Sequence, residues 1–248
     1  MLNNIPQVLI TPSKPALIEG VAQKLQVLVR VQAPDTDPTQ KRKERGPYHL
    51  SLVIDRSGSM SGEPLMEALR CADHIIGRLQ ATDVASLIVF DDRVDTLVRA
   101  RPLADSTAFR SALRSVQSGG QTNLHGGWEA GAESLAIDAD KAALARAILL
   151  SDGNANAGHT CDTEEIAALC AKAAERGITT STYGLGSRFN EELMVEMAKR
   201  GRGNSYYGET AADLFESFVE EFDLISNLYA RNVHLKVDPE VKTESCRV

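Results

Sequence analysis

Several features that would place this chain in a familiar class are scarce or missing. Aromatic residues make up only 5% of its 248 residues, and its four cysteines include no Cys-x-x-Cys pair, so they indicate neither a structural zinc site nor a disulfide framework. No apolar run approaches the roughly 20 residues that a membrane-spanning helix needs, and the first ten residues lack the basic and apolar regions of a signal peptide. We therefore expect a chain without a membrane segment, located in the cytoplasm unless an export signal has been lost from this sequence.

Positive charge is also scarce. The chain has 27 Lys and Arg against 34 Asp and Glu, a net charge of −7, which argues against a nucleic-acid partner because such proteins normally show a basic surface. The basic run at residues 41–45 lies beside Pro and Asp and is typical of a solvated loop. With 43% hydrophobic residues, the chain has enough apolar side chains to bury a sizeable core.

Between about residues 46 and 228, short β-branched runs alternate with longer amphipathic patterns. This rhythm is typical of a parallel sheet covered by helices. The turn between the second and third runs is so short that these two strands should pair antiparallel. We therefore expect an α/β fold, a doubly wound, mostly parallel six-stranded sheet with one antiparallel edge strand and flanking helices. The expected strands are 49–55, 83–90, 93–99, 146–152, 178–186 and 204–208, and the expected helices are 63–79, 106–116, 125–138, 162–176, 190–200 and 210–227.

The two ends of the chain follow a different pattern. Residues 24–32 and 231–238 alternate apolar and polar side chains, which is typical of strands with one solvent face. We expect them to pair in a small antiparallel β unit, with residues 7–11 as a candidate third strand. Because two or three strands are marginal alone, either this unit packs on the α/β body or the native chain continues past Val248. The expected division is 1–45 for an N-terminal β segment, 46–228 for the α/β domain and 229–248 for a C-terminal strand that returns to the β unit.

Oxygen-bearing side chains gather in three predicted loops. Asp55, Ser57 and Ser59 alternate in the turn after the first buried strand. Thr122 lies in a glycine-flanked loop before a helix, and Asp152 ends the apolar fourth strand. In a doubly wound sheet, ligands bind beyond the carboxyl ends of the strands, where the strand order switches. If the first and fourth strands flank that switch, the three loops converge and bring together two carboxylates and three hydroxyls.

This set of donors suits a hard divalent cation. Mg²⁺ takes about six oxygen ligands and normally keeps some waters. Alternate residues of an extended turn can point to the same side, and Gly58 lets the backbone bend between the two serines. Since hydroxyls are neutral and the two carboxylates supply a charge of about −2, an open coordination position should attract an anionic oxygen from outside. Residues 55–59 alone would also suit an ordinary turn, so this interpretation depends on all three loops.

The three loops resemble the metal-ion-dependent adhesion site (MIDAS) of the von Willebrand factor type A (vWA) domain family. The form is that of bacterial members and of inter-alpha-trypsin inhibitor heavy chains. The resemblance rests on DRSGSM at 55–60, GGQTNL at 119–124 and LLSDG at 149–153, in that order, and extends over about residues 48–227. It implies an intact MIDAS in a vWA, Rossmann-like fold.

The resemblance also implies a role for each donor. Ser57 and Ser59 would bind the metal directly, and Asp55 would hold the site through water or hydrogen bonds. Thr122 would bind directly when a partner is bound, and Asp152 would act directly or through water, depending on the state. The cation would be Mg²⁺, or Mn²⁺ or Ca²⁺, and a partner protein would donate an Asp or Glu carboxylate. The leading interpretation is therefore a non-enzymatic, cation-dependent protein-binding module.

Two other functions stay open. An open Mg²⁺ site beside a helix N-terminus can also take phosphate, so the second interpretation is a metal-assisted hydrolase or phosphoryl-transfer enzyme, with His125 or His159 as the base. Against it, the sequence contains no P-loop and no second aspartate two residues after Asp55. The third interpretation is a metal-free structural vWA adaptor in a larger assembly.

Residues in or beside the three loops are candidates for a rim that contacts the partner. His125 either contributes to this rim or is an ordinary surface histidine at a helix start. Trp128, the only tryptophan, is either an anchor for the partner or half-buried packing. The candidate rim residues are Arg56, Ser61, His125, Trp128 and Asn154.

Overall fold

The structure is a computed structural model that describes residues 6–16, 18–21, 23–33, 46–136, 144–185, 190–208, 210–226 and 236. Contacts within the chain divide it into two compact units, one of which spans Arg45–Ser226, while the other contains the two N-terminal strands. The expected C-terminal strand at 231–238 falls outside the described residues, except for Lys236.

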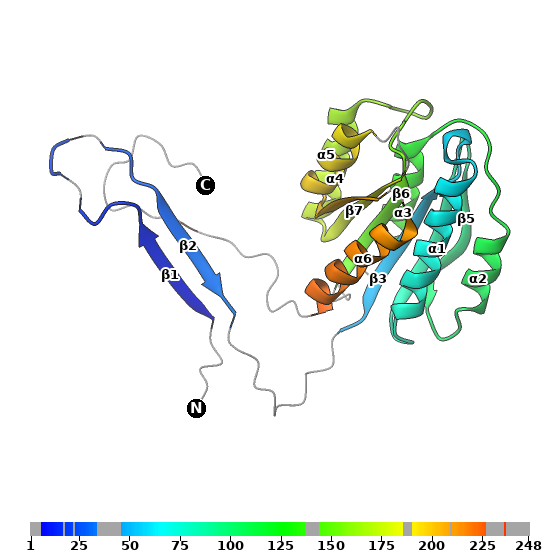
Figure 1. The fold of residues 1–248 in the computed structure, drawn as a ribbon, viewed down its shortest axis with the longest axis horizontal. Helices are drawn as coiled ribbons and strands as arrows, with labels where there is room; N and C mark the ends of the chain where they lie inside the picture. Colours follow the sequence, from blue (N-terminus) through cyan, green and yellow to red (C-terminus); the bar gives the residue numbers. More distant parts are fainter. Residues whose placement is uncertain are drawn as a thin grey trace. The chain divides into compact units, whose positions relative to one another are not determined.

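The larger unit is a sheet flanked by helices (Figure 1). The sheet has six strands in the order β5-β4-β3-β6-β7-β8. All neighbouring strands run parallel except β4 and β5, which pair antiparallel at one edge. β3 and β6 are buried along their whole length, as expected where helices cover both faces of a parallel sheet. The predicted sheet is therefore confirmed. Its strands are β3 (Tyr48–Asp55), β4 (Val84–Phe90), β5 (Val94–Pro102), β6 (Leu144–Ser151), β7 (Ile178–Leu185) and β8 (Arg202–Gly208).

Helices cover the two faces of this sheet (Figure 1). They enclose two separate hydrophobic cores. Because successive side chains of a strand point to opposite faces, Leu52 and Ile54 of β3 enter one core and Val53 enters the other. One core is completed by α1 (Glu63–Arg78), α2 (Thr107–Arg114) and α6 (Ala211–Ser226), and the other by α3 (Leu124–Ala136), α4 (Thr163–Glu175) and α5 (Glu191–Arg200).

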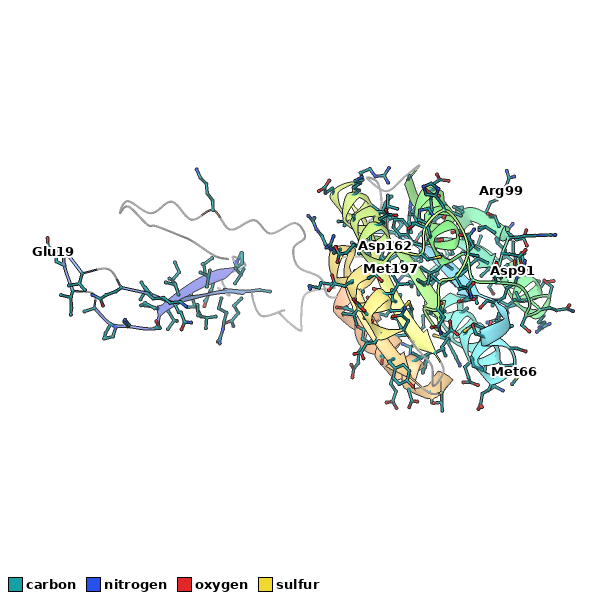
Figure 2. The ribbon with its side chains drawn as sticks, turned by 90° about the horizontal axis from the view of Figure 1, so that it is seen from above. Glu19, Met66, Asp91, Arg99, Asp162 and Met197 are labelled. Atoms are coloured by element: carbon teal, nitrogen blue, oxygen red, sulfur yellow. The ribbon has the colours of Figure 1, made fainter. Side chains whose placement is uncertain are left out.

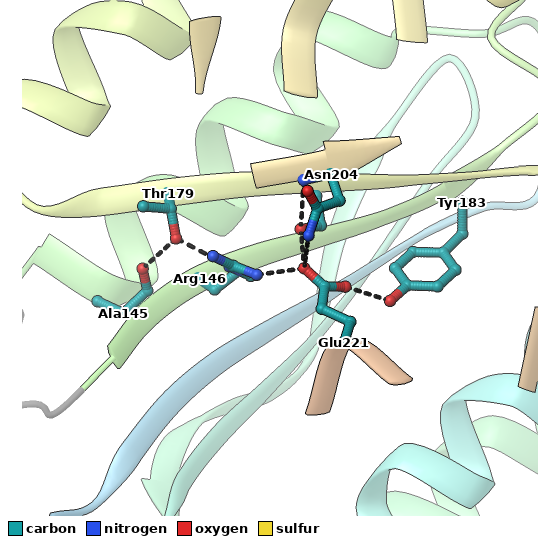
Figure 3. A network of polar contacts seen from close by, with 7 residues as sticks. Ala145, Arg146, Thr179, Tyr183, Asn204 and Glu221 are labelled. Carbon is teal, nitrogen blue, oxygen red and sulfur yellow. Dashed lines mark hydrogen bonds and ion pairs between the residues drawn. The ribbon is translucent and has the colours of Figure 1, made fainter. Parts of the chain in front are cut away.

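A buried polar network joins α6 to the sheet (Figure 3). The carboxylate of Glu221, a residue only 2% exposed, forms an ion pair with Arg146 on β6 and accepts a hydrogen bond from the Tyr183 hydroxyl on β7. It also accepts from Ser181 Oγ at 2.6 Å and from Asn204 Nδ2 at 3.4 Å. Burial and the neighbouring Glu221 carboxylate raise the pKa of Tyr183 well above its usual value, so this hydroxyl remains a donor.

Helix α3 lies close against the sheet because two of its residues, Gly127 and Gly131, have no side chain. A Cβ at Gly131 would lie 2.4 Å from Val53 Cγ2, and one at Gly127 would lie 2.3 Å from Phe90 Cδ1. Both neighbours are buried core side chains with little room to move. The approach of α3 to the sheet therefore depends on these two glycines.

We expect Gly131→Ala to lower the free energy of unfolding by about 1–3 kcal/mol, because the added methyl group overpacks the core. Gly77→Ala in α1 is the matched control, since a Cβ there meets no atom within 4 Å and alanine favours the helix by up to about 1 kcal/mol. Urea unfolding of both variants measures the difference. Equal stabilities would contradict the close packing of α3.

The smaller unit contains an antiparallel pair, β1 (Gln7–Pro12) and β2 (Val27–Gln32). The register pairs Val8 with Val31 and Ile10 with Val29, so one face of the pair is apolar. The sequence predicted strands in both segments, and the structure pairs these two with each other.

Candidate metal site

The first and third predicted loops meet where β3 and β6 end. These two strands pair in parallel, so Ser151, the last residue of β6, lies beside Asp55, the last residue of β3. Asp55 Oδ2 accepts a hydrogen bond of 2.6 Å from Ser151 Oγ, and Asp55 Oδ1 accepts one of 2.8 Å from the Ser57 backbone N–H. Asp152 follows Ser151 directly, so both carboxylates lie at this end of the sheet.

The two serines of the first loop lie next to each other. Ser57 Oγ and Ser59 Oγ are 3.1 Å apart, and a short 3₁₀ turn over Gly58–Met60 holds this geometry. Ser57 is buried beside Asp55, whereas Ser59 is exposed. One hydroxyl oxygen of the pair therefore lies inside the site, and the other lies at the protein surface.

Backbone hydrogen bonds tie the loop that carries Thr122 to the other two. Gly58 N donates to Gly120 O at 3.1 Å, which joins the first loop to the second. The Thr122 backbone N–H donates to Asn156 Oδ1 at 2.8 Å, and Asn156 N donates back to Thr122 O at 3.1 Å, which joins the second loop to the third. The predicted convergence of the three loops is thus present in the fold.

Negative charge is concentrated and buried in this site. Asp55 is 0% exposed and Asp152 is 5% exposed. Burial, with a smaller contribution from the charge of Asp152, raises the pKa of Asp55 from 3.8 to about 6, although hydrogen bonds from Ser151 and Ser57 act in the opposite direction. A cation bound between the carboxylates would relieve this unfavourable burial of charge.

The neighbouring arginine does not neutralise these carboxylates. Arg56 Nε lies 2.9 Å from Asp91 Oδ2, and its Nη2 lies 2.6 Å from Asp95 Oδ2. Both partners belong to the turn between β4 and β5 and the start of β5. The Arg56 guanidinium is therefore paired with Asp91 and Asp95, and not with Asp55 or Asp152.

In EDTA, the metal-free protein should lose stability as the pH rises through about 6. The folded state keeps the Asp55 proton up to a pKa of about 6, whereas an ordinary aspartate releases it near 3.8. The contribution to stability is fully present below the lower value and lost above the higher one, and it amounts to about 3 kcal/mol. Urea unfolding between about pH 4 and about pH 7.5 measures this change, which Asp55→Asn should remove. Parallel pH profiles for the two proteins would contradict it.

The candidate rim residues occupy different positions. Ser61 is exposed and accepts a hydrogen bond from Ser118 Oγ at 3.2 Å. Asn154 is half-buried, and its backbone N–H donates to Asp152 Oδ1 at 3.1 Å. Arg56, whose side chain is 17% exposed, is held by its two ion pairs.

Two of the rim predictions need correction. Trp128 is only 3% exposed, and its indole Nε1 donates to Thr180 Oγ1 at 3.0 Å, so it packs in the core and does not lie at a contact surface. His125 is 5% exposed, so it is not the surface histidine expected at a helix start. Its ring lies 6.0 Å from that of His159, which is exposed. The physical reason is the close approach of α3 to the sheet, which buries the first turns of that helix.

Sequence reasoning missed two residues that shape the site. Ser151 directly precedes Asp152 in the same motif, so its hydroxyl could have been predicted from the sequence to lie at the site. Asn156 positions Thr122, but nothing in the local sequence indicates which loop its amide will contact.

The donor set is rich in hydroxyls. Within the described residues, no group of three or more His, Cys, Asp or Glu side chains is placed to hold a metal ion. Any cation at the end of β3 and β6 would therefore depend on Ser and Thr oxygens as well as on the two carboxylates. None of the helices in the described part of the chain is long and apolar enough to cross a membrane.

Known proteins are similar to this chain over most of its length. The family model of the von Willebrand factor type A domain matches residues 49–221. The chain is 27% identical over 216 residues to an uncharacterised protein of Synechocystis, covering 87% of this chain and 49% of that protein. It is 28% identical over 187 residues to human inter-alpha-trypsin inhibitor heavy chain H3, covering 71% of this chain and 21% of that protein. The chain thus spans about half the length of the first relative and about a fifth of the second.

Solved structures agree on the fold. A von Willebrand factor type A protein of Catenulispora acidiphila has a TM-score of 0.66 at 19% identity, covering 89% of this chain and 50% of that one. Manganese-loaded TRAP protein of Plasmodium vivax has a TM-score of 0.57 at 17% identity, covering 73% and 74%. Proximal thread matrix protein 1 of the mussel byssus, with a zinc-occupied MIDAS motif, has a TM-score of 0.56 at 21% identity, covering 73% and 46%. Since the family match includes all three loops and most of the sheet, the chain belongs to the von Willebrand factor type A domain family.

Proposed function

We propose that Asp55, Ser57, Ser59, Thr122 and Asp152 form an intact MIDAS, and that its divalent cation accepts a carboxylate from a partner protein. The observation that carries the proposal is the convergence of the three loops at the ends of β3 and β6. There, Asp55 and Asp152 are both buried, and the hydroxyls of Ser57 and Ser59 lie in the loop that follows Asp55. A protein interior rarely buries two carboxylates at one end of a sheet without a compensating charge.

The chemistry of the donors favours a hard cation. All five side chains offer oxygen, and none offers nitrogen or sulfur, which suits Mg²⁺ and Mn²⁺ better than a soft metal. The TRAP protein structure is manganese-loaded, and the mussel byssus protein has zinc at its MIDAS motif. Both similar structures support a divalent ion here. We propose Mg²⁺, with Mn²⁺ and Ca²⁺ as the alternatives to be compared.

The number of donors at the site favours a partner that supplies an oxygen. Mg²⁺ takes about six oxygen ligands, so the five side chains leave a coordination position open to water or to a carboxylate oxygen from outside. Exposed Ser59 places part of the site at the surface, where an Asp or Glu of another protein can reach it. The cation would supply the attraction for this carboxylate, and the loops would orient it.

A binding role is favoured over catalysis. The sequence has neither a P-loop nor a second aspartate two residues after Asp55, the features that would indicate phosphoryl transfer. We therefore propose a non-enzymatic module in which a metal controls recognition.

Thermal melting in EDTA, Mg²⁺, Mn²⁺ and Ca²⁺ tests the proposal. A cation that binds only the folded state must raise the melting temperature. We expect a rise for the wild type that Ser57→Ala together with Ser59→Ala removes, and no change in this response for Ser118→Ala, a nearby hydroxyl outside the donor set. A wild type that melts at the same temperature in every buffer, even at millimolar cation, would contradict metal binding by the free protein.

A further inference from the structure

A groove separate from the metal site lies between α1 and α2. It has a volume of about 590 Å³, and the apolar part of its lining consists of Met66, Leu69 and Leu113. Met66 lies in the first turn of α1 and is 51% exposed, as its place at the surface in Figure 2 shows. Leu69 and Leu113 also pack against the core that contains Leu65 and Ile76, so Met66 is the apolar lining side chain that projects into solvent.

Positive charge surrounds this apolar floor. Arg70, Arg110 and Arg114 line the groove. Glu67 pairs with Arg70 at 2.6 Å, and Asp73 pairs with Arg110 at 3.0 Å. Arg114 has no ion pair with any residue that the structure describes. Since Glu67 and Asp73 compensate Arg70 and Arg110, the groove keeps one uncompensated positive charge, that of Arg114, in a chain whose net charge is −7.

We propose that this groove binds an acidic amphipathic segment of a partner protein. Apolar side chains of the segment would pack on Met66 and Leu69. One carboxylate would pair with Arg114, and another would share the exposed Arg110 with Asp73. Methionine adapts its shape to different apolar partners, and a guanidinium binds a carboxylate through two hydrogen bonds. The volume is within the range of ligand pockets and admits a few side chains.

The charges favour an acidic occupant over a purely apolar one. A purely apolar ligand would leave the Arg114 guanidinium, which has no ion pair with a described residue, without a carboxylate partner. A nucleic acid would be repelled by the acidic remainder of the chain. An amphipathic segment could pack its apolar face on the apolar lining and place its carboxylates beside the arginines, as in helix-in-groove recognition.

The contact does not involve the proposed metal. A MIDAS cation would coordinate one carboxylate directly, whereas the groove would recognise several carboxylates together with apolar groups. Binding at the groove should therefore persist in EDTA, and the two proposals can fail independently.

The test uses a fluorescein-labelled peptide of about 14 residues. Its leucines are spaced three or four residues apart to form one face of a helix, and glutamates flank that face. A second peptide carries lysine in place of each glutamate. Fluorescence anisotropy is measured in EDTA with the wild type, with Arg110→Glu/Arg114→Glu, and with Lys172→Glu/Arg176→Glu. The control pair changes two exposed basic residues at the C-terminal end of α4 and alters the net charge equally. Melting temperatures check that each variant is folded.

We expect the glutamate peptide to bind the wild type, and the Arg110→Glu/Arg114→Glu variant to bind it at least about tenfold more weakly than the control variant. Met66→Ala should weaken binding without a change of charge. The lysine peptide should not bind the wild type. The proposal is overturned if both double variants bind equally, if the two peptides bind alike, or if binding appears only when Mg²⁺ replaces EDTA. That last result would assign the peptide to the metal site instead.

Discussion

Replacing Glu221 with leucine is expected to lower the free energy of unfolding of the vWA domain by about 3–5 kcal/mol. The Glu221 carboxylate is 2% exposed and is the common acceptor for Arg146, Ser181 and Tyr183. Its loss leaves the Arg146 guanidinium, 7% exposed, without its buried counter-charge. Removing one partner of a buried ion pair costs more than the pair itself contributes, because the remaining charge stays out of water.

Urea unfolding of three variants separates this effect from a general weakening of α6. Glu220→Leu changes the neighbouring exposed residue of the same helix and should alter stability by no more than about 0.5 kcal/mol. Glu221→Leu combined with Arg146→Met removes both charges, and it should be more stable than Glu221→Leu alone. If the double variant is the less stable of the two, the unpaired charge is not the cause.

Asp55→Asn is expected to abolish the response to divalent cations. A wild type with cation at about 100 times its dissociation constant gains about 2.7 kcal/mol of unfolding free energy, and a variant that does not bind gains nothing. In EDTA near neutral pH, the same variant should be as stable as the wild type or more stable, by up to about 3 kcal/mol, because it no longer buries a carboxylate whose pKa is raised to about 6.

The geometry around Asp55 explains why asparagine can replace it without disrupting the metal-free fold. An asparagine Oδ1 can still accept from the Ser57 backbone N–H, and its Nδ2 can donate to Ser151 Oγ. Asp92→Asn is the control, since its side chain is 52% exposed on the turn between β4 and β5. Chemical unfolding with and without Mg²⁺ measures both effects. A variant that gains as much stability from the cation as the wild type does would contradict a metal role for Asp55.

Local patterns were sufficient to predict the elements of the α/β domain. The apolar run that ends at Asp55 and the helical spacing after Pro64 depend on residues only a few positions apart, and the structure places a strand and a helix at both. The same local patterns predicted that Asp55 and Asp152 lie where apolar strands end. The antiparallel edge strand was also predictable, because the turn before β5 is too short for a crossover.

Side-chain surroundings were predicted less well where they depend on packing between distant segments. The exposure of Trp128 and His125 was predicted from their place at the start of a helix. Whether that helix stands away from the sheet or lies against it depends on Gly127 and Gly131 meeting Phe90 and Val53. These pairs are far apart in the sequence, so the burial of the first turns of α3 had no local signal.

The sequence by itself determined where strands and helices form, that oxygen donors follow β3 and β6, and that this chemistry suits a hard cation. Only the tertiary structure decided that Ser151 bonds to Asp55, that Asn156 holds Thr122, and that Arg56 pairs with Asp91. The physical reason is that backbone conformation and side-chain periodicity are set by near neighbours in the chain. The partner of a side chain at the end of a sheet is set by strand order and register, which depend on the whole fold.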